Sequence, residues 1–216
     1  MDAGADYQRG NLMRNLAFST VVFAVIVAAG CSSDKGPNGG DPIPNVIAPL
    51  ALGNTWGGTQ IEYDSTGAEV VNFYQTFFIN QDTTIADARW FAIAGARSLL
   101  ANRDDGLWIR YGFQDTLDLQ DPSMYAMYPA TAGQSWQSGI GLSATVTAVS
   151  VDTSVTVPSG TYKCHLFRWV RNSGTRIDHY FIAPKTGWVK TEYYRFTDGG
   201  SQYLYGSWEL EELVLE

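Results

Sequence analysis

The chain has 216 residues, of which 45% are hydrophobic, 13% are aromatic and 17% are charged. This composition is typical of a globular protein and excludes a disordered, collagen-like or coiled-coil chain. Fourteen Lys and Arg residues against 22 Asp and Glu residues give a net charge of −8, which argues against nucleic acid as a partner. The two cysteines, Cys31 and Cys164, are too few for a disulfide framework or a four-cysteine zinc site.

An apolar run near the N-terminus has the features of an export signal. Residues 16–29 form this run, and as a helix they would span about 21 Å, too short for a hydrocarbon core of about 30 Å. The run therefore predicts a signal peptide and not a membrane-spanning helix. Acidic and basic residues upstream of it cancel, whereas signal peptides begin with net positive charge, so we expect Met13 and not Met1 to be the initiator.

The apolar run ends in Val27-Ala28-Ala29-Gly30-Cys31. This segment resembles the lipobox of bacterial lipoproteins, in which cleavage before the cysteine leaves an acylated N-terminal cysteine. The resemblance implies that residues 1–30 are a lipoprotein signal peptide and that Cys31 carries the lipid, palmitate included, that anchors the protein in the cell envelope. Ala28 departs from the Leu preferred there, and an ordinary secretory leader is the alternative. Ser32 follows the cysteine, and the absence of Asp at that position favours the outer membrane.

The mature chain divides into a tether and one domain. Residues 31–45 are rich in Gly, Pro, Ser and Asn and have no apolar period, which predicts a flexible tether. Residues 46–216 alternate apolar and polar side chains in short runs separated by turn sequences, which predicts a single β domain. We expect strands at residues 56–65, 68–80, 87–95, 97–103, 107–113, 140–152, 161–171, 175–183, 187–197, 201–206 and 208–215, and one helical turn at 122–127.

These runs predict an all-β fold, an antiparallel meander of about 10 to 11 strands. A flat sheet of that width is unusual, so we expect a curled or barrel-like sheet, with a two-sheet β-sandwich as the alternative. Two segments, residues 49–56 and 129–136, share the pattern Pro-x3-Gly-x2-Trp. They indicate either a duplicated half, with Trp56 and Trp136 at one rim of the sheet, or a recurrent way of beginning a strand.

Those two segments and two later ones resemble a family of secreted or lipid-anchored bacterial domains of unknown function. The family motifs are Pro-Leu-x-x-Gly-Asn-x-Trp, Tyr-Pro-x3-Gly-x2-Trp, Val-Pro-x-Gly-Thr-Tyr and Ala-Pro-x-x-Gly-x-Val-Lys. They match residues 49–56, 128–136, 157–162 and 183–190 of this chain. Lys185 and Trp188 depart from the residues often found there. The resemblance implies a β domain in the envelope, and the family supplies no active site.

The two histidines cannot share a metal ion if the segment around Ser173-Gly174 is a two-residue hairpin loop. In that register His165 lies opposite Ile182 and His179 opposite Arg168, on opposite faces of the sheet. We therefore expect no metal site and no cofactor. Cys164 precedes His165 directly, so the two side chains point apart, and we expect a buried thiol and not a nucleophile. The acidic residues are expected to be solvated at the surface: Asp104, Asp105, Asp115, Asp118 and Asp121.

Aromatic residues remain as the candidates for ligand contact. The hairpin at residues 161–183 is apolar on both faces, as in a strand pair that either lies within a two-layer core or wraps an internal cavity. The candidates for contact are Trp56, Trp136, Trp169, Tyr180 and Trp188. We predict a non-catalytic, lipid-anchored envelope domain that binds an apolar ligand, a glycan or an envelope protein, or has a structural role. A secreted hydrolase with an unrecognised site is the alternative.

Overall fold

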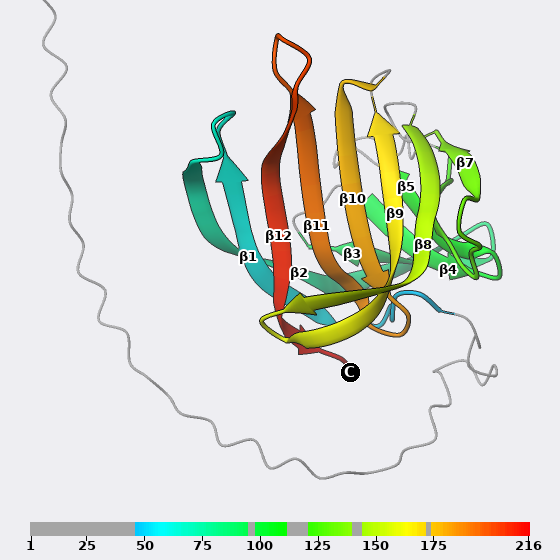
Figure 1. Cartoon of the computed structure of the whole chain (residues 1–216). Coiled ribbons are helices and arrows are strands. Elements are labelled where there is room, and N and C mark those ends of the chain that lie inside the picture. Colours follow the sequence, from blue (N-terminus) through cyan, green and yellow to red (C-terminus); the bar gives the residue numbers. More distant parts are fainter. Residues whose placement is uncertain (1–45, 95–97, 112–120, 140–143, 172–173) are drawn as a thin grey trace, which may run out of the picture. The chain divides into compact units, whose positions relative to one another are not determined.

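The computed structural model describes residues 46–94, 98–111, 121–139, 144–171 and 174–216. The predicted signal peptide, the tether and Cys31 lie outside these residues. Figure 1 shows the strands β1 Thr55–Tyr63, β2 Glu69–Ile85, β3 Ala88–Ile93, β4 Ser98–Arg103, β5 Gly106–Tyr111, β6 Ser123–Met127, β7 Ser135–Ser138, β8 Ala144–Val157, β9 Gly160–Arg171, β10 Arg176–Ala183, β11 Gly187–Phe196 and β12 Gln202–Val214. Among the described residues, no helix is long and apolar enough to cross a membrane.

All twelve strands belong to one antiparallel sheet in the order β6-β5-β4-β3-β2-β1-β12-β11-β10-β9-β8-β7. The sheet curls until its edge strands β6 and β7 meet through side chains. Ser123 Oγ and Ser138 Oγ are 3.1 Å apart, and Trp136 Nε1 donates to the carbonyl oxygen of Met124 at 3.2 Å. This nearly closed, barrel-like sheet confirms the predicted all-β antiparallel meander.

Three strands differ from the sequence-based expectation in type or number, and β2 and β8 each extend five residues beyond their predicted ends. The helical turn predicted at residues 122–127 is wrong, because this segment forms strand β6 and pairs with β5. Strand β7 was not expected, since it has only four residues. The two strands predicted at 201–206 and 208–215 are one strand, β12, which passes through Gly206. A Cβ at Gly206 would lie 3.1 Å from the carbonyl oxygen of Ile61, so glycine here allows close packing of β1 and does not end the strand.

Strand β2 is long because it belongs to two parts of the curled sheet. Its first half pairs with β1, and residues from Ile79 onward pair with β3 after a shift of register. The segment from Glu69 to Phe77 therefore has a sheet neighbour on one side only among the described residues. Its side chains Val70, Val71 and Phe73 are exposed. Figure 1 shows this edge beside β1, away from the other strands.

The two Pro-x3-Gly-x2-Trp segments have the same local structure. Gly53 and Gly133 have φ values of 90° and 88°, and their N–H groups donate to the carbonyl oxygens of Ile79 and Ala148. In each segment the tryptophan Nε1–H then donates to a backbone carbonyl oxygen. Each segment leads into a run of six strands, β1–β6 and β7–β12.

The β9–β10 hairpin has the predicted register. His165 pairs with Ile182 and His179 pairs with Arg168, so the two histidines lie on opposite faces. One face of the hairpin points into the core, where Phe167, Trp169, Tyr180 and Ile182 are buried. On the other face Leu166, Val170 and Phe181 are half-buried. The inward face packs against β5 and β6 from the far side of the curled sheet.

Candidate apolar binding site

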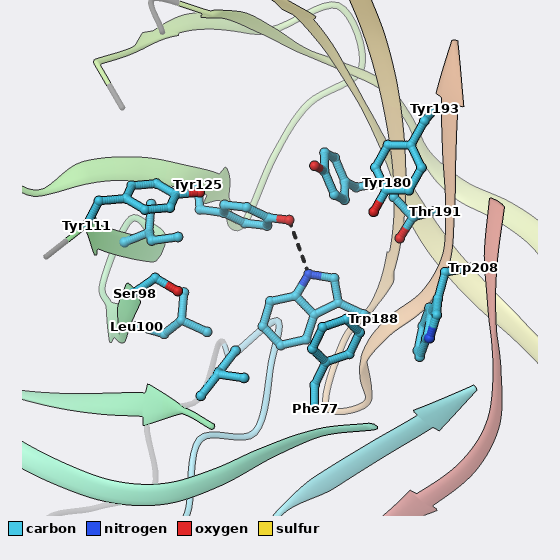
Figure 2. A pocket seen from close by; sticks show the side chains of 12 residues that line it. Phe77, Ser98, Leu100, Tyr111, Tyr125, Tyr180, Trp188, Thr191, Tyr193 and Trp208 are labelled. Atoms are coloured by element: carbon cyan, nitrogen blue, oxygen red, sulfur yellow. Dashed lines mark hydrogen bonds between the residues drawn. The ribbon is translucent and has the colours of Figure 1, made fainter. Parts of the chain in front are cut away.

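The inner side of the curled sheet holds a partly open cavity of about 200 Å³ (Figure 2). It forms where alternate side chains of strands from both parts of the sheet point inward. Aromatic and aliphatic groups make up most of its wall. The lining residues are Phe77, Ile93, Ser98, Leu100, Ile109, Tyr111, Tyr125, Tyr180, Trp188, Thr191, Tyr193 and Trp208.

Tyr125 on β6 and Trp188 on β11 meet across this cavity. Trp188 Nε1 donates to the Tyr125 hydroxyl oxygen at 3.3 Å, as the dashed line in Figure 2 shows. The Tyr125 ring also lies 5.1 Å from the ring of Trp169 and 5.5 Å from that of Tyr180, between centroids. Trp56 packs edge-on against Trp188 at 5.4 Å. Ring pairs at these distances attract one another, so the aromatic wall is preformed.

The tyrosine hydroxyls are the titratable groups of this wall. Burial raises the pKa of Tyr111, Tyr125, Tyr180 and Tyr193, because an ionised phenolate loses its hydration there. All four hydroxyls are therefore protonated at neutral pH. The described lining residues include no carboxylate, imidazole, thiol or amine. The site offers apolar contact and neutral hydroxyl groups.

The five aromatic residues singled out in the sequence occupy three different positions. Tyr180 and Trp188 line the cavity. Trp56 and Trp169 lie directly behind these two, in ring contact with them. Trp136 contacts Phe167 at 5.9 Å and is not part of the lining.

Sequence reasoning missed most of the cavity wall. Phe77, Tyr125 and Trp208 come from β2, β6 and β12, which are far apart in the chain. Tyr125 was assigned to a helical turn, so its direction was not considered. Alternation within β12 does carry a signal, because Trp208 and Leu210 follow a buried period of two.

The histidines and the cysteine lie apart from this cavity. His165 is buried with its Nδ1 lacking a hydrogen-bond partner among the described residues, and burial lowers its pKa. His179 lies on the other face, with Nδ1 3.7 Å from the Glu192 carboxylate. Cys164 is fully buried, as expected. The described residues contain no group of three or more His, Cys, Asp or Glu side chains that could hold a metal ion.

Comparison with known proteins finds little similarity of sequence. No protein-family model and no curated protein matches the chain. A solved structure from Bacteroides fragilis, provisionally classed as an exported protein with a YmcC-like fold, is 14% identical, covers 79% of this chain and 100% of its own, and has a TM-score of 0.47. One from Parabacteroides distasonis, provisionally classed as a lipoprotein, is 12% identical with coverage of 79% and 99% and a TM-score of 0.40. Likeness at this level assigns no function to the chain.

Proposed function

We propose that this protein is a lipid-anchored domain of the bacterial cell envelope that binds an apolar group inside its β domain and is not an enzyme. The observation that carries the binding role is the cavity of about 200 Å³ with its aromatic wall. A dry apolar cavity of about 150 Å³ binds benzene or xenon. This cavity therefore has room for a group larger than a benzene ring, such as part of an acyl chain.

The tryptophans support an apolar ligand over a glycan. All seven belong to the described part of the chain, and each is buried or half-buried. Stacking of sugars needs an aromatic face that is open to solvent. Trp188 and Trp208 instead turn their rings toward the interior of the sheet (Figure 2).

The chemistry of the cavity wall supports binding over hydrolysis. General acid–base catalysis needs a group that gains or loses a proton near the working pH, within hydrogen-bond reach of the substrate. The cavity offers hydroxyl groups whose protons are held more tightly than in water. Water and substrate would find no base among the described lining residues.

The sequence supports the anchor. Cys31 follows a short apolar run that ends in Ala29-Gly30, and residues 31–45 have the composition of a flexible chain. Such a chain of 15 residues has an average end-to-end distance of roughly 20 Å. The domain would therefore remain within a few tens of ångströms of its membrane, which by the residue after Cys31 is the outer membrane.

Fractionation of cells that produce a Cys31→Ala variant tests the anchor. We expect the variant to leave the membrane fraction or to retain its leader, because the acylated residue is gone. A Ser32→Ala variant, which keeps the cysteine, is the control and should remain in the membrane. Normal processing and membrane retention of Cys31→Ala would refute the anchor.

Binding of a neutral apolar dye tests the cavity. The mature protein, held by its own anchor in phosphatidylcholine nanodiscs, is titrated with N-phenyl-1-naphthylamine, and empty discs give the background. We expect saturable binding of one dye per chain, lost in Ile93→Trp, which fills the cavity, and kept in Val149→Trp, whose site is exposed and outside the lining. Ser98→Phe fills the cavity from another strand, in case Ile93→Trp does not fold. Unchanged binding in both filling variants would refute the role of the cavity.

A further inference from the structure

Three charged side chains lie at the turn end of the β9–β10 hairpin. Arg171 Nε donates to Asp178 Oδ2 at 2.7 Å, and Arg176 Nε donates to Asp178 Oδ1 at 2.8 Å. Asp178 is completely buried, whereas the side chains of Arg171 and Arg176 are 11% and 39% exposed. Two guanidinium groups thus share one carboxylate, and the three side chains carry one positive charge in excess.

This cluster is joined to the wall of the cavity. Arg171, Arg176 and Asp178 lie on the face of the hairpin that also carries Tyr180, because all four are in register on alternate positions. Arg171 Nη2 donates to the Tyr180 hydroxyl oxygen at 3.4 Å. The Arg176 guanidinium lies 5.4 Å from the centre of the Tyr193 ring. Tyr180 and Tyr193 both line the cavity, and Figure 2 places them side by side on β10 and β11.

Arg176 is held in place and still reaches solvent. Its Nε is fixed by a carboxylate that is itself fully buried, so the direction of the side chain is set by the core. An arginine oriented in this way offers the remaining edge of a planar group that matches a carboxylate or a phosphate. The surplus cation is notable in a chain with a net charge of −8, whose overall field repels anions.

We propose that the ligand of the cavity is an anionic amphiphile, with its apolar chain in the cavity and a carboxylate or phosphate monoester head bound by Arg176. The proposal rests on the apolar binding role proposed above and adds the class of ligand. Arg171 acts as a positioning residue, because it bonds the Tyr180 hydroxyl and shares Asp178 with Arg176. Fatty acids and alkyl phosphates share this chemistry.

Competition against the bound dye tests the proposal in the same nanodiscs. Decanoate, decyl phosphate and decanol have equal chains and are used below their aggregation concentrations. We expect Arg176→Gln to weaken the binding of decanoate and of decyl phosphate about ten-fold, because only the charged heads lose a charge-assisted hydrogen bond. The affinity for decanol should be unchanged. The head group is identified by the anion, decanoate or decyl phosphate, that binds more tightly. Arg176→Lys should restore part of the preference for the two anions over decanol.

Arg168→Gln is the matched control. Arg168 belongs to the same hairpin, but its side chain lies on the opposite face, beside His179. The same charge is removed, so an effect of net charge alone would appear in both variants. We expect Arg176→Gln to fold, because Asp178 keeps its pair with Arg171.

The outcomes separate the two proposals. Binding of the dye and of all three amphiphiles with no effect of Arg176→Gln would overturn the anionic head and leave the apolar site standing. Equal losses for decanol and decanoate in Arg176→Gln would also overturn it. Absence of any saturable binding of the dye would overturn the proposed function itself.

Discussion

Cys164 shows how burial decides the chemistry of a single residue. It sits in β9 next to His165, yet the two side chains point in different directions, and the sulfur packs among the apolar residues of the core. Burial raises the pKa of the Cys164 thiol to about 12, because the thiolate would lose its hydration there. The side chain is a small apolar group of the core.

We therefore expect Cys164 to be unreactive in the folded protein. In a Cys31→Ser variant Cys164 is the one remaining cysteine, so Ellman's reagent reports it alone. Near pH 8 the native protein should show no reaction over hours, and unfolding in guanidinium chloride should release one thiol per chain. Rapid labelling of the native protein would show that this part of β9 is open.

The direction of such residues could be predicted, and their surroundings could not. Alternation along β9 and β10 fixed which face Phe167 and Tyr180 share, and the structure confirms it. The partners across the cavity could not be inferred, because Tyr125 approaches Tyr180 only after the sheet has curled. No period within a single strand encodes that contact.

On the outer face of β10 and β11 an acidic side chain is held by three neighbours. The His179 imidazole, the Tyr194 hydroxyl at 2.8 Å and the Lys190 ammonium at 3.2 Å lower the pKa of Glu192 to about 2 from its ordinary value of 4.5. Since the folded-state pKa is the lower one, this carboxylate stabilises the fold above about pH 4.5. The stabilisation is lost as the pH falls toward 2.

Replacement of Glu192 by Gln should make this dependence visible. We expect Glu192→Gln to be less stable than the wild type at pH 6, and the difference should shrink as the pH falls from 4.5 toward 2. Urea unfolding at a series of pH values measures it. Glu211→Gln removes the same charge from an exposed site on β12 and is the control. A difference that is independent of pH would mean that Glu192 acts through packing and not through its charge.

The open edge of β2 is a feature of the element and not of one residue. From Val70 to Gln81 the strand carries no charge. Among the described residues its first half pairs with β1 alone, and its apolar side chains Val70, Val71 and Phe73 are exposed. Sheet edges of soluble proteins are normally protected by charges, prolines or bulges, because an unprotected edge can pair with another chain.

A lysine in this edge should protect it at little cost. Val71 is 41% exposed, so Val71→Lys is expected to change the free energy of unfolding by less than about 0.5 kcal/mol. Light scattering measured as the protein is concentrated should show that Val71→Lys aggregates only at a higher protein concentration than the wild type. Val71→Thr keeps the branched side chain without the charge and is the control. Equal behaviour of the two variants would exclude edge pairing as the route of aggregation.

At the level of strands, the sequence predicted those with clear alternation and missed those defined by their partners. The second half of β2 is polar, from Asn80 to Thr84, and forms a strand because β3 pairs with it. Residues 122–127 suggested one helical turn, whereas the pairing with β5 makes this segment extended. In both places a tertiary contact outweighs the local preference.

At the scale of the whole molecule, the described strands β6 and β7 form a seam, because they are the two edges of the curled sheet and have no backbone ladder between them. Side chains hold it, including the contact of Ser123 with Ser138 and the bond from Gly139 N to Ser123 Oγ at 2.7 Å. Strands β1 and β12, in contrast, each have two backbone neighbours. Local opening at the seam therefore needs less free energy than unfolding of the domain.

Hydrogen exchange should reveal this difference. We expect amides of β6 and β7 to exchange by local opening, at rates well above those of β1 and β12, which need global unfolding. Ser138→Ala should increase exchange in β6 and β7 and leave β1 and β12 unchanged. Val149→Thr, at an exposed site on β8 beyond the residues that pair with β7, is the control. Uniform protection across the sheet would show that the seam is as stable as the backbone ladders.

The meander also determines how the domain responds to tension. Among the described strands, the β1–β12 ladder is the one set of backbone pairs that joins the two six-strand halves, and its outermost pair is Thr55 with Val214. A force applied between these two residues breaks the hydrogen bonds of the ladder one after another from that end. It does not load them all at once in shear. Little force is then needed, and as the ladder parts, Trp208 leaves the wall of the cavity. Tension between the N-terminal side of the domain and its last strand would thus convert mechanical work into release of the apolar ligand proposed for the cavity.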